Sequence, residues 1–117
     1  SGKAEIKPES MKILHYVAEL LKKDEFKEKQ IKVEGHTDTD PIHRSIEFPT
    51  NWELSAIRAT NVLRYLVEVE SVDGKRISSS GYSYYRPIAP NDIKANKAKN
   101  RRVDIVILRT SEEALEP

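Results

Sequence analysis

Two charged side chains, Asp38 and Arg58, have the types and surroundings that could bind a ligand. Asp38 ends residues 35–38 (GHTD), where a short apolar strand pattern gives way to a tight polar turn. Arg58 lies about two turns into a predicted helix, at the margin of its apolar stripe. A guanidinium does not release its proton, so the two groups make a poor acid–base pair. Together they can hold the two ends of a zwitterion, such as the amino-acid end group of a peptide.

The same loop carries residues of metal-ligating types, namely His36, Asp38, Asp40 and His43. Zinc uses such ligands. However, the chain has no cysteine, and no pair of histidines at helical spacing would fix the geometry of a site. A polar loop that simply carries polar side chains is therefore the better interpretation, and we expect neither a metal nor a cofactor.

Hydrolytic chemistry has little support in the sequence. No Gly-x-Ser-x-Gly elbow is present, and no serine stands at a strand-to-helix nucleophile turn. Asp38 and Asp40 could act as paired glycosidase carboxylates, but they lie two residues apart in a loop and nothing in the sequence indicates that either is buried. We expect the chain not to be an enzyme.

Charge and composition limit the possible partners. The chain has 20 Lys and Arg against 19 Asp and Glu, a formal net charge of +1, which argues against a dedicated nucleic-acid binder. A local basic run could form a phosphate-binding patch, although a solvated loop that balances acidic residues elsewhere explains it better. That run consists of Lys94, Lys97, Lys99, Arg101 and Arg102.

The length of 117 residues suits a single domain with one core. We place this domain at residues 1–110 and an acidic, frayed tail at residues 111–117. No apolar run approaches the length of a membrane span.

The predicted elements begin with an amphipathic helix over residues 8–23, where Pro8 occupies the first turn. Alternating apolar and charged residues predict a half-buried strand over residues 31–35. Residues 38–50 have no periodicity and contain two prolines, and a loop of this length in a small domain is usually functional or disordered.

Thr50 and Glu53 fit a capping box that opens a second helix, which we expect to end near Val69. A strand over residues 77–82, a short helix within residues 91–100 and a last strand over residues 101–109 complete the chain. This order predicts an α+β or α/β sandwich with helices on one face of a small sheet.

Four blocks stand in an order that matches a known family: residues 33–38 (VEGHTD), 51–59 (NWELSAIRA), 81–82 (GY) and 100–105 (NRRVDI). They resemble the OmpA-like peptidoglycan-binding domain and together extend over most of the chain. Within that family, residues 48–55 (FPTNWELS) and 82–87 (YSYYRP) are most similar to the MotB group of flagellar motor stator subunits.

The resemblance implies an α+β two-layer sandwich, with helices on one face of a small mixed β-sheet, that anchors its parent protein to the cell wall without catalysis. It implies that Asp38 and Arg58 bind the peptidoglycan stem peptide, of diaminopimelate type. The expected walls of the pocket are Thr37, Asn51, Leu54 and an arginine of the 100–102 block, for which we choose Arg102 over Arg101.

Two departures from the family pattern bear on these expectations. The family's first β-strand has no counterpart near residues 1–6, so we expect an open sheet edge. The membrane helix of a stator subunit is also absent from this sequence. We therefore expect the periplasmic part of a membrane-anchored protein, with the stator channel subunit and possible homodimerisation as partners. The alternative is an OmpA-like or lipoprotein wall anchor with no motor role.

Overall fold

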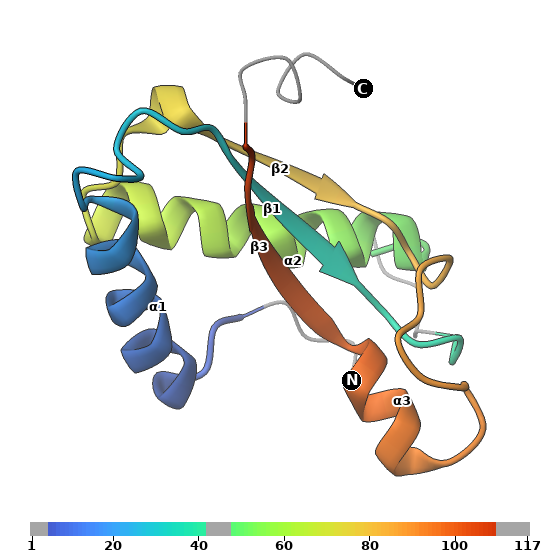
Figure 1. The fold of residues 1–117 in the computed structure, drawn as a ribbon. Helices are drawn as coiled ribbons and strands as arrows, with labels where there is room; N and C mark the ends of the chain where they lie inside the picture. Colours follow the sequence, from blue (N-terminus) through green and yellow to red (C-terminus); the bar gives the residue numbers. More distant parts are fainter. Residues whose placement is uncertain (1–4, 42–47, 110–117) are drawn as a thin grey trace.

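The computed structural model describes residues 5–41 and 48–109 of the chain (Figure 1). A π-helical turn, Tyr65–Val69, directly continues the second helix, and a 3-10 turn, Gly74–Arg76, leads into the second strand. In chain order the main elements are α1 (Pro8–Leu21), β1 (Ile31–His36), α2 (Asn51–Arg64), β2 (Ile77–Gly81), α3 (Lys94–Asn100) and β3 (Arg102–Ile107).

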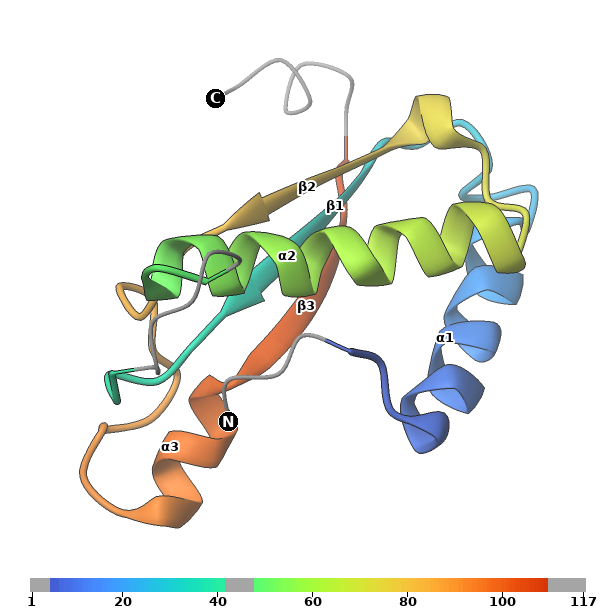
Figure 2. The same ribbon diagram turned by 180° about the vertical axis from the view of Figure 1, so that it is seen from behind.

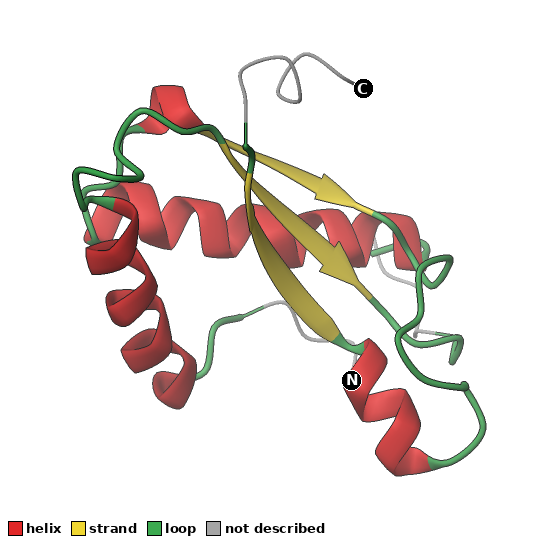
Figure 3. Cartoon of the chain, in the orientation of Figure 1, coloured by secondary structure: helices red, strands yellow, loops and turns green. Residues whose placement is uncertain are grey.

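The three strands form one mixed sheet in the order β2-β1-β3 (Figure 3). The central strand, β1, is parallel to β2 and antiparallel to β3. This arrangement confirms the predicted α+β class and the mixed sheet. Within the described residues no strand precedes α1, so β3 is an edge strand, as expected.

The two faces of the sheet differ in character because successive strand residues point to opposite sides. α2 crosses one face, as seen from behind in Figure 2, and the buried Leu14, Ala18 and Leu21 of α1 join the same core. On that face, β1 lies opposite apolar residues of β3: Ile31 with Ile107, Val33 with Ile105 and Gly35 with Val103. The short α3 lies beyond the end of the sheet rather than over its face (Figures 1 and 2).

The N-terminus of α2 confirms the capping box read from the sequence. The Thr50 hydroxyl accepts a hydrogen bond from the Trp52 amide at 3.1 Å, and the Glu53 carboxylate accepts one from the Thr50 amide at 2.8 Å. The helical stretch ends at Val69, as predicted, but its last turn is π-helical, with the Glu70 amide donating to the Tyr65 carbonyl. The caps therefore place the start of α2 directly after the long loop.

The α1–β1 connector is tied to the start of β2 by one side chain. The guanidinium of Arg76 donates to the carbonyls of Leu21, Phe26 and Lys29 at 2.9, 2.6 and 3.1 Å. A single planar group with several donors can satisfy carbonyls that a connector without regular structure leaves unpaired. These hydrogen bonds hold the connector that leads into β1 against the start of β2.

Two glycines let α2 pack directly on the backbone of the sheet. A Cβ atom at Gly35 would lie 2.0 Å from the carbonyl oxygen of Ser55, and one at Gly81 would lie 2.4 Å from the amide nitrogen of Ala56. No side chain fits in either place, so the N-terminal half of α2 sits closer to β1 and β2 than a larger residue would allow. None of the described helices is long and apolar enough to span a membrane.

Substitution of Gly35 by alanine should destabilise the fold, because the new methyl group would overlap the Ser55 carbonyl. We expect the free energy of unfolding in urea to fall by about 1–3 kcal/mol or more. Gly74→Ala is the matched control, since its Cβ would meet only Val67 at an ordinary 3.7 Å. Equal losses in the two variants would show that the close approach of α2 is not what Gly35 provides.

Candidate functional site

Asp38 occupies a turn that leaves the end of β1. The Thr37 amide donates to the carbonyl of Ser83, which ties this end of the strand to the segment after β2. The Asp38 carboxylate accepts a hydrogen bond from the Asp40 amide at 3.0 Å, so the turn is closed on its own side chain. Asp38 is only 5% exposed, and a carboxylate so deeply buried requires charged or hydrogen-bonding partners.

Arg101 supplies the direct charged partner of Asp38, with its Nη1 atom 2.5 Å from the carboxylate. Arg58 belongs to the same group of charges. Burial lowers the pKa of the Arg58 guanidinium, the nearby positive charge of Arg101 lowers it further, and the negative charge of Asp38 raises it. A guanidinium stays protonated even so. The fold therefore brings one carboxylate and two arginines together, with a net charge of +1.

A cleft of about 450 Å³ extends from these arginines along the groove between α1 and β3. Its polar end carries Arg58, Arg101 and Arg102, and its apolar wall includes Val62, Val103 and Ile105. Such an arrangement suits an extended ligand that ends in a carboxylate and has an apolar stem.

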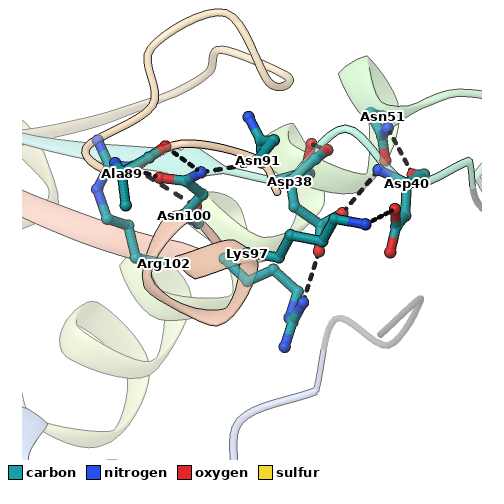
Figure 4. A network of polar contacts seen from close by, with 10 residues as sticks. Asp38, Asp40, Asn51, Ala89, Asn91, Lys97, Asn100 and Arg102 are labelled. Carbon is teal, nitrogen blue, oxygen red and sulfur yellow. Dashed lines mark hydrogen bonds and ion pairs between the residues drawn. The ribbon is translucent and has the colours of Figure 1, made fainter. Parts of the chain in front are cut away.

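The other predicted site residues lie around the turn in different ways. Thr37 and Leu54 are buried, at 3% and 1% exposure, and the Thr37 hydroxyl donates to the Asp38 carbonyl at 2.9 Å. The side-chain amide of Asn51 donates to the Asp40 carbonyl at 3.2 Å, which joins the start of α2 to the loop (Figure 4).

Arg102 lies differently from the position that the sequence suggested for it. Its guanidinium donates to both carboxylate oxygens of Asp104, at 3.1 and 3.2 Å, and to the Arg86 carbonyl. Strand β3 begins at Arg102, so this residue shares the face of Asp104, away from α2. Arg101 precedes the strand, where alternation does not apply, and its side chain reaches Asp38 instead.

Asn100 has a structural role in the site that sequence reasoning missed. This fully buried side chain accepts hydrogen bonds from the Ile88 and Ala89 amides at 2.8 and 3.0 Å. It donates to the Ala89 carbonyl and the Asn91 side chain, both at 2.9 Å (Figure 4). These four hydrogen bonds hold the end of α3 against the preceding loop, and so they position the adjacent Arg101. Asn100 opens the motif at residues 100–105, which marked it as a residue of interest. Spacing in the sequence does not reveal a network of hydrogen bonds to a separate loop.

The basic run seen in the sequence is largely neutralised in the structure. Lys97 pairs with Asp40 at 2.8 Å, which lowers the pKa of that carboxyl group through the hydrogen bond (Figure 4). Arg101 pairs with Asp38, and Arg102 with Asp104. Because three of its five cations already have acidic partners, the run is a poor phosphate-binding patch.

The metal interpretation changes in the structure. His43 lies outside the described residues. His36 points to the sheet face opposite α2 and lies near Glu34 and Asp104. One possible ligand atom from each of these three side chains lies within 4.8 Å of the others. Both carboxylates already have partners, since Arg102 binds Asp104 and the Tyr82 hydroxyl donates to Glu34. Asp38 belongs to a different cluster, so the described members of the loop set, His36, Asp38 and Asp40, do not converge on one point.

His36 is buried and stacks on the ring of Tyr82 at a centroid distance of 5.3 Å. Burial is the largest cause that lowers its pKa, followed by the positive charge of Arg102. The carboxylates of Asp104 and Glu34 raise its pKa, and the positive charge of Arg86, the smallest of these effects, lowers it. The net effect is a pKa below the ordinary value, so His36 is mostly neutral at pH 7 in the folded state.

Comparison with known proteins shows the family of the chain. The sequence pattern of the OmpA family matches residues 1–101, so the chain belongs to the OmpA family. Motility protein B of Bacillus subtilis is 40% identical over 108 residues, which cover 92% of this chain and 40% of that protein. Outer membrane protein Omp38 of Acinetobacter baumannii is 35% identical over 100% of this chain and 31% of its own length. The chain thus spans less than half of these relatives.

Solved structures show the same fold. The C-terminal domain of Helicobacter pylori MotB has a TM-score of 0.84 and 29% identity, covering 97% of this chain and 83% of the compared chain. The cell wall anchor of the type VI secretion system of Pseudomonas aeruginosa has a TM-score of 0.78 and 34% identity, covering 90% of this chain and 70% of the other. Both MotB-type and other anchor domains therefore share this architecture.

The lowered pKa of His36 predicts a stability change in mildly acidic solution. In the unfolded chain His36 takes up a proton near its ordinary pKa of 6.5, whereas the folded chain resists protonation. The unfolded state then binds more protons, so the free energy of unfolding should fall as the pH drops below about 6.5. Urea unfolding between pH 7.5 and 5 measures this change while the carboxylates remain ionised.

His36→Gln should flatten the dependence of stability on pH over this range, whatever its effect on the stability at pH 7.5. An equal slope in this variant and the wild type would mean that another group causes the pH dependence.

Proposed function

We propose that this domain binds peptidoglycan without catalysis and anchors a flagellar motor stator to the cell wall. The observation that carries the proposal is the buried Asp38 carboxylate, held beside Arg58 and Arg101, the two arginines that line one end of the cleft. Membership of the OmpA family and the similarity to MotB proteins support the same function.

The ligand in this proposal is the zwitterionic end group of a stem peptide, of diaminopimelate type. Its carboxylate would bind the Arg58 guanidinium, whose planar fork can donate two parallel hydrogen bonds. Its ammonium would bind Asp38, because a carboxylate offers about four acceptor positions and can take an ammonium beside Arg101 and the Asp40 amide. The net positive charge of the three groups favours an anion at their centre.

The remaining proposed ligand residues shape the pocket around this pair. Because Thr37 and Leu54 are buried, we propose that they support the pair from within the fold, while Asn51 holds the turn in place through Asp40. Arg102 contributes to the lining of the cleft, but its guanidinium is bound to Asp104 on the other face of the sheet, so we propose Arg101 as the arginine that meets the stem.

The motor role is the finer part of the proposal. In a stator, this domain, residues 1–110, would lie in the periplasm. Its partners would be the channel subunit and, in a homodimer, a second copy of the chain. The proposed tail at residues 111–117 lies outside the described residues. Similarity to Omp38 and to a secretion-system wall anchor favours, as the alternative, an anchor with no motor role. A membrane helix encoded upstream would support the stator, and a lipobox or a β-barrel would support the alternative.

Asp38→Ala and Arg58→Ala should each weaken binding to insoluble peptidoglycan. Removing one partner of a buried, hydrogen-bonded charge pair commonly costs about 2–5 kcal/mol, which corresponds to about thirty-fold or more in affinity. Arg58→Lys should also fail, because an ammonium cannot reproduce the planar fork. Co-sedimentation with purified peptidoglycan across a protein concentration series measures the loss.

Asp24→Ala is the matched control, since the Asp24 side chain is 98% exposed and pairs only with Lys27 among the described contacts. Asp38→Asn keeps the shape of the side chain and removes its negative charge, so it tests the charge alone. Circular dichroism checks that each variant is folded. If both alanine variants stay folded and sediment like the wild type, the site is wrongly assigned. Release of soluble fragments from the peptidoglycan would contradict a non-catalytic role.

A further inference from the structure

His36 is a buried titratable side chain that the proposed binding site does not use. It is 2% exposed, and neither of its ring nitrogens has a hydrogen-bond partner among the residues that the structure describes. A protonated imidazole has two N–H donors and a positive charge, so it costs more to bury in this place than the neutral ring does. The surroundings of His36 therefore have to change when the ring takes up a proton.

Charged and titratable groups from three parts of the chain surround the His36 ring and the tyrosine ring that stacks on it. They are Lys32 and Glu34 of β1, Arg102 and Asp104 of β3, and Tyr82 and Arg86 of the segment after β2. Among these groups, the Asp104 carboxylate lies 3.5 Å from Nε2 of His36, close enough to pair with a protonated ring. Arg102 already binds both oxygens of that carboxylate, so a protonated His36 would compete with Arg102 for Asp104.

This competition would take place at the end of the sheet that leads to the binding site. His36 and Arg102 form the last cross-strand pair between β1 and β3. Two residues after His36 the chain reaches Asp38, and Arg101 directly precedes Arg102, so the Asp38–Arg101 ion pair closes the same end of the two strands. Repulsion between a protonated His36 and the Arg102 opposite it would push the strands apart next to this ion pair.

We propose that protonation of His36 loosens the Asp38–Arg101 ion pair, so that the domain holds its ligand less tightly in mildly acidic solution. The ligand meant here is the stem peptide, so the choice of ligand rests on the proposed function. His36 is then a positioning residue, because it acts on the site through Arg102 and does not touch the peptide.

The direction of the effect follows from the burial of the ring. Burial is the main cause that lowers the pKa of His36, so the folded chain takes up this proton below the ordinary value of 6.5. Protonation and peptide binding oppose each other in this scheme. By thermodynamic linkage, a bound peptide must therefore make His36 harder to protonate, by the same free energy by which the proton weakens peptide binding.

Co-sedimentation with purified peptidoglycan at pH 7.5 and at pH 5 measures the coupling. The dissociation constant of the wild type should rise by about five-fold or more between the two, the lower end of the range usual for coupled sites. In His36→Gln, which has no group that titrates, the two constants should be nearly equal. The carboxylates of the ligand stay mostly ionised at pH 5, because their ordinary pKa is about 4. Circular dichroism at both pH values checks that a loss of binding is not unfolding.

His15→Gln is the matched control among the three histidines of the chain. The His15 side chain is 61% exposed on α1 and pairs with Glu70, which follows the helical stretch of α2 at the end opposite to the site. This variant should keep the pH dependence of the wild type. His43→Gln tests the remaining histidine in the same way and should keep it too.

A second measurement needs neither a variant nor a ligand. In NMR spectra of the free wild-type chain, the backbone amide signals of Asp38 and Arg101 should shift with pH. Their midpoint should equal the midpoint of the imidazole C–H signals of His36, because one protonation event moves all three residues.

Three results would overturn the proposal. They are an equal pH dependence of binding in the wild type and His36→Gln, a pH dependence that only His43→Gln removes, and signals of Asp38 and Arg101 that stay in place while His36 titrates. A folded wild type that fails to bind peptidoglycan at either pH would contradict the proposed function instead. The NMR titration would then still decide whether His36 controls the ion pair.

Discussion

The contact of the α2 backbone with the backbones of β1 and β2 is the constraint on which the rest of the structure depends. Gly35 and Gly81 leave no side chain between helix and sheet, and the Ser55 carbonyl and Ala56 amide fill the space. Packing at this distance places the start of α2 beside the ends of both strands. Arg58, one turn beyond Ser55, is thereby carried to the turn that holds Asp38.

A buried carboxylate at that turn sets the second requirement, because an unpaired charge there would cost several kcal/mol. Arg101 meets it, and Asn100 holds Arg101 in place through four hydrogen bonds to the loop before α3. The site is thus assembled from three distant parts of the chain. It is preorganised, which lowers the cost of ordering side chains when a ligand binds.

Local patterns predicted the elements well. The capping box at Thr50 and the first-turn proline of α1 act over a few residues, so their geometry follows from neighbours in sequence. The choice of Arg102 over Arg101 shows a question that local sequence patterns cannot answer. Which of two adjacent arginines reaches Asp38 depends on the residue at which β3 begins, and pairing with β1 determines that point.

By itself, the sequence determined the helices, the strands, the α+β class and the family, because periodicity, caps and short motifs are local properties of the chain. It also singled out Asp38 and Arg58. Only the tertiary structure decided that Arg101 pairs with Asp38, that Asn100 is buried and that His36 faces away from the cleft. Those outcomes depend on contacts between residues far apart in sequence, and such contacts exist only once the sheet and α2 have packed together.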